Sequence, residues 1–447
     1  MKVTIIGAGS YIWSFGFSRQ LIDSKAIKGL ELTLMDISVP DLNRTAEIIE
    51  KYNTSHGSPA VIKRSGDLNA AVKGADFVVV CISTGGLDAM EHDLAVPARY
   101  GIFHTVGDTV GPGGLLRAVR NIPVFARIGK AMQKYCPNAW LINVSNPLTV
   151  LTRTPHKLYG IKTIGMCPGV DEQAKLLCRI AGFANDARID FTVAGIDHGS
   201  WFTSLMADGK DVLAILKKQG YYRSDGKLPK TVKGHDPLAE DSGSIAVFAL
   251  WRELGYMPAL NDRHQTENFP WFLPRSSSAD IPYRIKRTSI QDRRNWRKGR
   301  IKLYSNPGSA LEKLSAGHGD DPVVEVIESL AGFRSLTYSV NYRNVGQTPQ
   351  LPPDAVVETR ARFDAAGVHP FASPLPPIPT ITVLPHVIRQ ETIIDIALNG
   401  TFDELVALVL TDPLCSRLEL PQCRRMVREM LQANKHLIPN RKLLKFN

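Results

Sequence analysis

The sequence lacks the features that would place it in a membrane or outside the cell. No apolar run reaches the roughly 20 residues that a transmembrane helix needs. The apolar N-terminal segment has no basic leader and no cleavage site, so it does not resemble a secretory signal. None of the six cysteines lies in a Cys-x-x-Cys pair, so neither a disulfide framework nor a zinc knuckle is indicated. We therefore expect a cytoplasmic protein with no membrane partner.

The sequence also lacks a recognisable nucleic-acid-binding module, although its formal net charge is +11. Much of the basic excess lies in two segments, 284–302 and 417–445, which together hold a single aromatic residue, Trp296. Solvated surfaces explain such runs better than nucleic acid does. The length of 447 residues is sufficient for two domains with sizeable cores.

The N-terminal forty residues have the pattern of a dinucleotide-binding βαβ unit. A β-rich run ends in Gly7-Ala8-Gly9-Ser10, an amphipathic segment follows to Ser24, and a second strand, 30–35, ends on Asp36. Glycines at such a turn let the backbone approach a pyrophosphate, and the next helix offers its N–H groups to that anion. A carboxylate at Asp36 favours NAD over NADP because it accepts hydrogen bonds from the ribose hydroxyls. Ile12 departs from this motif because it replaces the usual third glycine.

Three further strands are predicted at 77–82, 140–144 and 162–166, and each ends in small or polar residues. In an open α/β sheet that edge holds the ligand. These segments predict a Rossmann-type α/β domain over residues 1–195, followed by an α+β substrate domain over 196–447. The predicted cofactor-binding residues are Gly7, Gly9, Ser10, Asp36, Ser83, Gly85, Asn143 and Ser145.

The second half of the chain has a less regular pattern. Helices are predicted at 245–254, 284–302 and 322–331, and a strand at 337–344. The segment 220–240 is predicted to be a surface loop because it is polar and rich in Lys and Gly. The proline-rich segment 351–385 is predicted to wrap the surface between strands, and the chain after Leu384 to be mostly helical.

Motifs spread over nearly the whole chain occur together in one order. They are Gly7-Ala8-Gly9-Ser10, Leu32-Thr33-Leu34-Met35-Asp36, Ala75-Asp76-Phe77-Val78, Gly85-Gly86, Pro112-Gly113-Gly114, Ser145-Asn146-Pro147, Cys167, Gly195-Ile196-Asp197-His198, Asn261-Asp262-Arg263-His264, Phe269-Pro270-Trp271-Phe272, Asn344-Val345-Gly346 and Leu351-Pro352-Pro353-Asp354. In these motifs and their order the chain resembles glycoside hydrolase family 4, the NAD- and metal-dependent glycosidases whose fold is similar to lactate and malate dehydrogenases. The α-galacturonidase, α-glucuronidase and α-glucosidase branches look most similar.

The resemblance implies a redox route to hydrolysis. NAD takes hydride from C3 of the sugar, a base removes the acidified C2 proton, the C1 group leaves, and water and hydride are then added back. A divalent ion, usually Mn²⁺, stabilises the enediolate. The positions that match the metal ligands are Cys167 and His198, and a Cys–His pair leaves coordination sites open for sugar oxygens.

The resemblance also implies substrate and catalytic residues. Asn146 matches the residue that reaches the sugar hydroxyls, and Asp108 lies where many members carry Glu. Asp262 is the first choice for the base, followed by His264 and Tyr256. The family's general acid has no counterpart here, because Pro168 has no ionisable group, so that role stays open among Asp171, Asp197, His264 and a metal-bound water.

The expected substrate is a non-phosphorylated glycoside, either an α-linked uronide or a neutral hexoside. The segment after Gly86 lacks the arginines that would bind a phosphate, whereas Arg263 or Arg287 could hold a uronic acid carboxylate bidentately. A sugar or hydroxyacid dehydrogenase without net hydrolysis and a non-catalytic NAD-binding protein remain as alternatives. The resemblance further suggests a homodimer or homotetramer.

Overall fold

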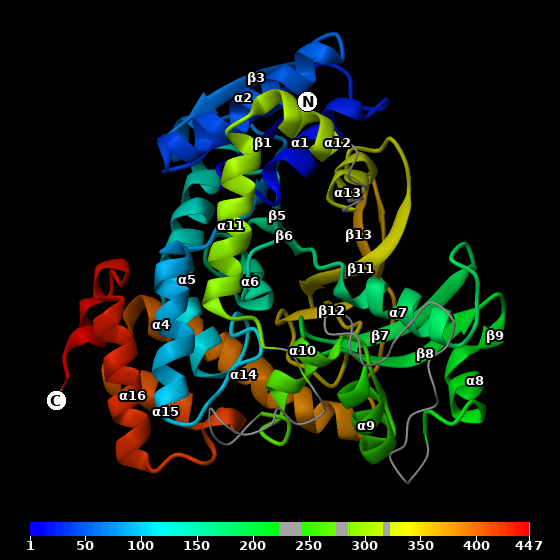
Figure 1. Cartoon of the computed structure of the whole chain (residues 1–447), viewed down its shortest axis with the longest axis vertical. Helices are drawn as coiled ribbons and strands as arrows, with labels where there is room; N and C mark the ends of the chain where they lie inside the picture. Colours follow the sequence, from blue (N-terminus) through cyan, green and yellow to red (C-terminus); the bar gives the residue numbers. More distant parts are fainter. Residues whose placement is uncertain (223–243, 274–284, 286, 316–321, 447) are drawn as a thin grey trace.

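The computed structural model describes residues 1–222, 244–273, 285, 287–315 and 322–446. One large sheet crosses this part of the chain, and its N-terminal half is parallel with the strand order β3-β2-β1-β4-β5-β6. That order is the doubly wound arrangement of dinucleotide-binding domains. The predicted Rossmann-type fold is therefore confirmed (Figure 1). The parallel strands are β1 (Lys2–Ile6), β2 (Leu30–Met35), β3 (Ala60–Ser65), β4 (Phe77–Val80), β5 (Trp140–Asn143) and β6 (Lys162–Gly165).

Neighbouring residues of the parallel strands enter separate hydrophobic cores. On β4, Val78 and Val80 join the core that contains helices α5, α14, α15 and α16. Phe77 and Val79 join the core on the opposite face, with α1, α2 and α13. Side chains alternate along a strand, so continuous apolar runs are required when both faces of a sheet are covered.

The second half of the sheet is antiparallel and joins the first without a break. Strand β11 pairs with β6 through Asn341 and Gly165, and the order continues β11-β12-β7-β8-β10. The predicted domain boundary at 195/196 falls directly after β7, which pairs with β8 and β12. The strands of this half are β7 (Ile189–Gly195), β8 (Trp201–Ala207), β9 (Lys210–Asp211), β10 (Met257–Pro258), β11 (Leu336–Arg343), β12 (Val356–Asp364) and β13 (Gly367–Pro370).

The prediction that residues 351–385 wrap the surface is wrong. Strand β12 occupies a central position in the sheet, with β11 on one side and β7 on the other. Prolines flank this strand but none lies within it, so its ladder of hydrogen bonds is uninterrupted. The predicted loop at 220–240 lies mostly outside the described residues.

Helices cover both faces of the sheet, and the loops that lead into several of them lie around its carboxyl edge. Helix α5 begins at Gly111, α4 lies beside it, and α11 lies beside α4 (Figure 1). No helix in the described ranges is long and apolar enough to cross a membrane. The helices are α1 (Ser14–Asp23), α2 (Val39–Ser55), α3 (Leu68–Val72), α4 (Gly86–Arg99), α5 (Gly111–Tyr135), α6 (Leu148–Tyr159), α7 (Gly169–Ile180), α8 (Val212–Lys218), α9 (Ile245–Leu254), α10 (Asp262–Gln265), α11 (Ile290–Tyr304), α12 (Pro307–Ser315), α13 (Val323–Leu330), α14 (Pro377–Asn399), α15 (Phe402–Leu410) and α16 (Leu420–Ala433), with 3₁₀ turns at Thr266–Asn268, Pro413–Cys415, Lys435–Leu437 and Arg441–Leu444.

Candidate functional site

A row of paired residues across the sheet brings the two predicted metal ligands together. Gly165 pairs with Asn341, Asn341 with Glu358, and Glu358 with Gly195. The chain leaves β6 at Gly165 towards Cys167, and leaves β7 at Gly195 towards His198. Ligand atoms of Cys167, Asp197 and His198 consequently lie within 4.8 Å of one another.

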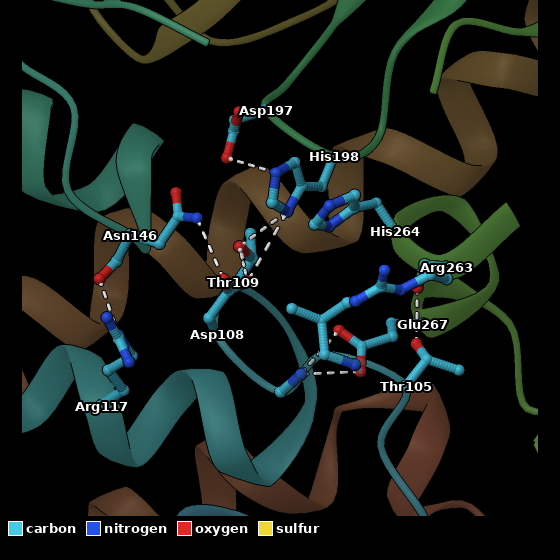
Figure 2. Close-up of polar contacts among 12 residues, drawn as sticks. Thr105, Asp108, Thr109, Arg117, Asn146, Asp197, His198, Arg263, His264 and Glu267 are labelled. Atoms are coloured by element: carbon cyan, nitrogen blue, oxygen red, sulfur yellow. Dashed lines mark hydrogen bonds and ion pairs between the residues drawn. The ribbon is translucent and has the colours of Figure 1, made fainter. Parts of the chain in front are cut away.

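The His198 imidazole is oriented by Thr109 and Asp108 (Figure 2). The Thr109 hydroxyl donates to Asp108 Oδ1 at 2.9 Å, so its oxygen accepts a hydrogen bond from His198 Nδ1–H, also at 2.9 Å. This assigns the Nδ1–H tautomer and leaves the lone pair on Nε2, which lies 3.6 Å from Asp197 Oδ2. Metal-bound histidines are oriented in this way by an oxygen on the other ring nitrogen.

The backbone at His198 supports the same conclusion. Its φ of 62° places a non-glycine residue in the left-handed region, which is costly unless the surroundings hold it there. The Asn268 side chain donates to the His198 carbonyl oxygen. The surrounding contacts therefore hold His198 in a strained backbone conformation, and this conformation orients its imidazole.

The residues around His198 Nε2 fit a divalent cation. Apart from the neighbouring Cys167 thiol, the Asp197 carboxylate has no hydrogen-bond partner in the described part of the chain, although the residue is only 1% exposed. Burial and the nearby Asp108 charge raise the pKa of Asp197 to about 8, and burial raises the pKa of the Cys167 thiol well above its usual value. A thiolate, an imidazole and a carboxylate buried together need a compensating positive charge, and this mixed donor set suits Mn²⁺, Fe²⁺ or Zn²⁺.

Asp108 connects the cation site to the predicted sugar-binding residue. Asn146 Nδ2 donates to Asp108 Oδ2 at 3.2 Å (Figure 2). Burial alone would raise the pKa of Asp108, but the imidazoles of His198 and His264 and the Arg117 guanidinium outweigh it and hold that pKa well below its usual value. Asp108 therefore stays ionised next to the cation site.

His264 also lies in this cluster. Its ring centroid is 3.9 Å from that of His198, and its ligand atom lies within 4.8 Å of those of Asp108 and His198. Burial, together with the neighbouring His198, lowers the pKa of His264 to about 3. The imidazole is therefore neutral at neutral pH and has a lone pair available.

Asp262 and Tyr256, the other two predicted base residues, are placed differently. Asp262 Oδ1 accepts from the Val247 main-chain N–H at 2.8 Å, so this carboxylate caps the N-terminus of α9. Burial raises the pKa of Asp262 to about 7, against main-chain N–H groups that lower it. Tyr256 packs against the apolar cluster around Trp201.

Glu267 holds the loop that carries Asp108 and Thr109. Its carboxylate accepts hydrogen bonds from the main-chain N–H groups of Val106 and Gly107, at 2.8 and 2.9 Å, and from His104 Nδ1 at 3.2 Å. His104 and Glu267 are both buried. A charge-assisted anchor of this kind fixes the loop without touching the reacting groups.

The two arginines predicted to bind a carboxylate have other contacts. Arg287 Nε donates to the His104 carbonyl at 3.2 Å, and its guanidinium stacks on Phe103. Arg263 donates to the Thr288 hydroxyl, while its carbonyl accepts from Thr105. Two arginines that were not predicted, Arg117 and Arg293, also act on the cluster, because both lower the pKa of Asp108, as Arg263 lowers that of His264.

The cofactor end has the close approaches expected of a dinucleotide turn. A Cβ added at Gly7, where φ is +92°, would lie 2.4 Å from the Cys81 carbonyl oxygen. Asp36 accepts from the Gly9 N–H at 2.8 Å, and Ser10 accepts from the N–H groups of Ile12 and Trp13. Ile12 is 64% exposed, so the missing third glycine causes no clash.

The remaining predicted cofactor residues divide into two groups. Asn143 is fully buried, and Ser145 bridges the Ile82 N–H and the Val80 carbonyl, so both hold strand ends together. Gly85, the N-cap of α4, has a φ of 80°. Ser83, two residues before it, is exposed at the edge of the sheet. Ser83 and Gly85 are therefore better placed than Asn143 to face a ligand.

Pro168 is the N-cap of α7, which explains why a proline is tolerated next to Cys167. At that position a missing N–H removes no helical hydrogen bond. Sequence reasoning did not identify Glu267, Arg117 or Arg293 as site residues. The only signal for Arg293 was the basic segment, which we attributed to solvated surface.

Comparison with known proteins identifies the family. Residues 2–182 match the Family 4 glycosyl hydrolase, and residues 193–415 match the Family 4 glycosyl hydrolase C-terminal domain. The chain is 32% identical to an α-galacturonidase of Thermoanaerobacterium saccharolyticum, over 99% of this chain and 97% of the relative. It is 30% identical to an α-galactosidase of Bacillus subtilis, over 84% of each chain.

Solved structures agree with this match. A putative glucosidase of Bacillus subtilis superposes with a TM-score of 0.87 at 30% identity, over 96% of this chain and 99% of the other. A 6-phospho-α-glucosidase from gut microorganisms, solved in complex with NAD and Mn²⁺, gives 0.79 at 18% identity, over 98% and 99% of the two chains. Malate dehydrogenase from Plasmodium falciparum gives 0.51 at 15% identity, over 91% and 99%, which shows the shared fold. The chain belongs to glycoside hydrolase family 4.

Proposed function

We propose that this family 4 glycosidase hydrolyses α-linked uronides, with α-galacturonides as the first candidates. The observation that carries the proposal is the 32% identity to an α-galacturonidase over 99% of this chain. The cluster of Cys167, Asp197, His198 and Asp108 supports it, because a sugar bound there would meet a cation site and a polar anchor together. The predicted neutral hexoside remains the alternative substrate, as an α-galactosidase is also among the relatives.

In this proposal Cys167, His198 and Asp197 hold Mn²⁺ or another divalent ion. The ion, when bound, would supply positive charge to the bound sugar. Thr109 holds the imidazole in its ligand tautomer, and Asn146 orients the hydroxyls while Asp108 fixes the Asn146 amide. Apolar burial of these groups excludes water and strengthens each electrostatic contact.

NAD would lie along the carboxyl edge of the parallel strands, where Gly7 and Gly9 leave room for the pyrophosphate. When bound, it supplies reversible oxidation at C3 of the sugar. Asp36 has both oxygens engaged by the N–H groups of Gly9 and Ser38. Each oxygen retains a lone pair for a ribose hydroxyl.

We expect Asp36→Asn to relax the choice of cofactor. A carboxylate repels the 2′-phosphate of NADP and accepts from the ribose hydroxyls of NAD, whereas an amide does so less well. NAD affinity should fall by about tenfold to a hundredfold, as for loss of a charge-assisted hydrogen bond. Fluorescence titration with NADH and NADPH measures both. An unchanged ratio of the two affinities would count against a ribose contact at Asp36.

For the proton at C2 we infer that His264 is the base, in preference to Asp262 and Tyr256. It belongs to the same cluster as His198, and its Nδ1 has no hydrogen-bond partner in the described part of the chain, whereas Asp262 is occupied by the N-terminus of α9. His264→Gln should lower kcat by about 10²–10⁴, the usual contribution of a general base. Asp262→Asn keeps the shape of the cap and should lower kcat by less than about tenfold. A larger loss in Asp262→Asn than in His264→Gln would reverse the assignment.

The proposed function is tested with nitrophenyl α- and β-glycosides of galactose, glucose, galacturonate and glucuronate, each with and without NAD and Mn²⁺. Hydrolysis in deuterium oxide should place deuterium at C2 of the released sugar. NADH release without cleavage of the aglycone would instead favour a dehydrogenase. No turnover of any glycoside would refute the proposal.

A further inference from the structure

Two arginine side chains meet over one methionine at the edge of the site. Arg117 Nη1, from α5, lies 3.7 Å from Met90 Sδ, and Arg293 Nη1, from α11, lies 2.8 Å from the same sulfur atom. Arg117 is only 7% exposed, and burial is the largest cause that lowers the pKa of both guanidinium groups. Two positive charges are thus held side by side in a partly dry environment.

Neither arginine forms an ion pair within the described part of the chain. Arg117 Nε donates to the Asn146 carbonyl at 2.9 Å, and Arg293 Nη2 donates to the Val106 carbonyl at 3.1 Å. A thioether sulfur is a weak acceptor. Buried guanidinium groups are normally matched by a carboxylate in direct contact. Asp108 attracts both groups from beyond ion-pair distance, so this pair has the composition of a site for an anion.

The neighbouring arginines on the same helices show what an internal partner looks like. Arg120, one turn further along α5, forms a two-pronged ion pair with Asp93 of α4. Arg294, next to Arg293 on α11, pairs with Asp88 and Glu91 of α4. Helix α4 therefore supplies acids to both neighbours, and it presents an apolar Met90 to the pair of Arg117 and Arg293.

The pair also lies next to the sugar-binding residues. The Asn146 carbonyl accepts from Arg117, while the Asn146 amide reaches Asp108 (Figure 2). Val106, whose carbonyl accepts from Arg293, lies two residues before Asp108. An anion bound by the two guanidinium groups would accordingly belong to the same ligand as the hydroxyls near Asn146.

We propose that Arg117 and Arg293 together bind the carboxylate of the uronic acid, with Arg293 as the main determinant of specificity. This inference rests on the proposed function and names the residues that select its substrate. Planar guanidinium groups match a carboxylate geometrically and bind it more strongly than a hydroxymethyl group. The pair replaces Arg263 and Arg287, which were expected from the sequence.

The test compares Arg293→Gln and Arg293→Lys with a matched control, Arg294→Gln, in the holoenzyme. Nitrophenyl α-galacturonide and α-galactoside are the substrates. Arg293→Gln should lower kcat/KM for the galacturonide by about tenfold to a hundredfold, and by less than about threefold for the galactoside. Arg293→Lys should recover part of the loss, because it keeps the charge without the fork. Arg294→Gln should leave both substrates unchanged.

A second variant and a binding measurement complete the test. Met90→Glu should place a carboxylate against Arg117 and Arg293 and offset their positive charge. It should therefore lower galacturonide turnover, as Arg293→Gln does. Calorimetry should show that the wild type binds D-galacturonate at least about tenfold more tightly than D-galactose, and that Arg293→Gln abolishes this difference.

The outcomes distinguish this inference from the proposed function. Equal losses on both substrates, or no loss on the galacturonide, would overturn the assignment of the pair while the glycosidase stands. If the wild type cleaved only galactosides, a uronide substrate would be ruled out, and with it both the proposed uronide specificity and the carboxylate site at the two arginines. If no glycoside were cleaved, the proposed function would fail, and equal binding of galacturonate and galactose would overturn the arginine site independently.

Discussion

His198→Ala is expected to lower kcat/KM by on the order of 10³-fold or more, because it removes the imidazole from the cation site. His198 lies within 4.8 Å of both Cys167 and Asp197, and no other histidine among the described residues is so placed. The variant should also lose high-affinity Mn²⁺ binding, which electron paramagnetic resonance measures without any substrate. Activity and metal binding should therefore fall together.

Thr109→Val is the graded counterpart of that experiment. The Thr109 hydroxyl fixes the His198 tautomer from the side away from the cation, at 2.9 Å from Nδ1. Loss of such a supporting hydrogen bond typically costs about 10–100-fold in metal affinity or activity. His56, an exposed histidine stacked on Tyr52 far along the chain from the site, provides the control as His56→Gln. Full Mn²⁺ binding in His198→Ala would contradict the ligand assignment.

Asp93→Ala is expected to lower the free energy of unfolding by about 3–5 kcal/mol, the usual cost of leaving one partner of a buried ion pair. Arg120 and Asp93 are 1% and 0% exposed, and the guanidinium contacts both carboxylate oxygens. Removing Asp93 leaves the positive charge of Arg120 buried between α4 and α5. Urea unfolding followed by circular dichroism measures the loss.

Two comparisons separate this loss from a general effect of substitution. The double variant Asp93→Leu with Arg120→Met removes both charges and should be closer to the wild type than Asp93→Ala alone. Glu50→Ala breaks the exposed pair with Arg64 and should cost no more than about 1 kcal/mol. Equal losses in Asp93→Ala and Glu50→Ala would show that burial of the ion pair does not determine its contribution.

The parallel half of the fold could be predicted because its signals are local. Turn glycines and continuous apolar runs indicate βαβ units directly, and the departure at Ile12 proves harmless since the side chain is exposed. Strand β12 was missed because its place depends on distant pairing, while the prolines around it suggested a loop. Local patterns do not encode such long-range pairing.

The candidate site was predictable only in part. Cys167 and His198 came from the family resemblance, and their proximity follows from strand pairings more than 150 residues apart in sequence, those of Gly195 with Glu358 and of Gly165 with Asn341. The sequence did not predict that Asp262 caps the N-terminus of α9, because this residue follows the helix in the sequence instead of directly preceding it. Arg293 was hidden in a basic segment, since charge composition does not reveal which face of a helix is buried.

The uninterrupted sheet has a consequence for how the molecule tolerates change. The residues Gly165, Asn341, Glu358 and Gly195 join the parallel half of the sheet to the antiparallel half beside the row from which Cys167 and His198 project. A single residue inserted after Gly195 would move the His198 imidazole away from Cys167, although the strand pairings themselves would remain intact. Loops away from this row can therefore change in length without moving these groups, whereas the short connections that leave Gly165 and Gly195 cannot.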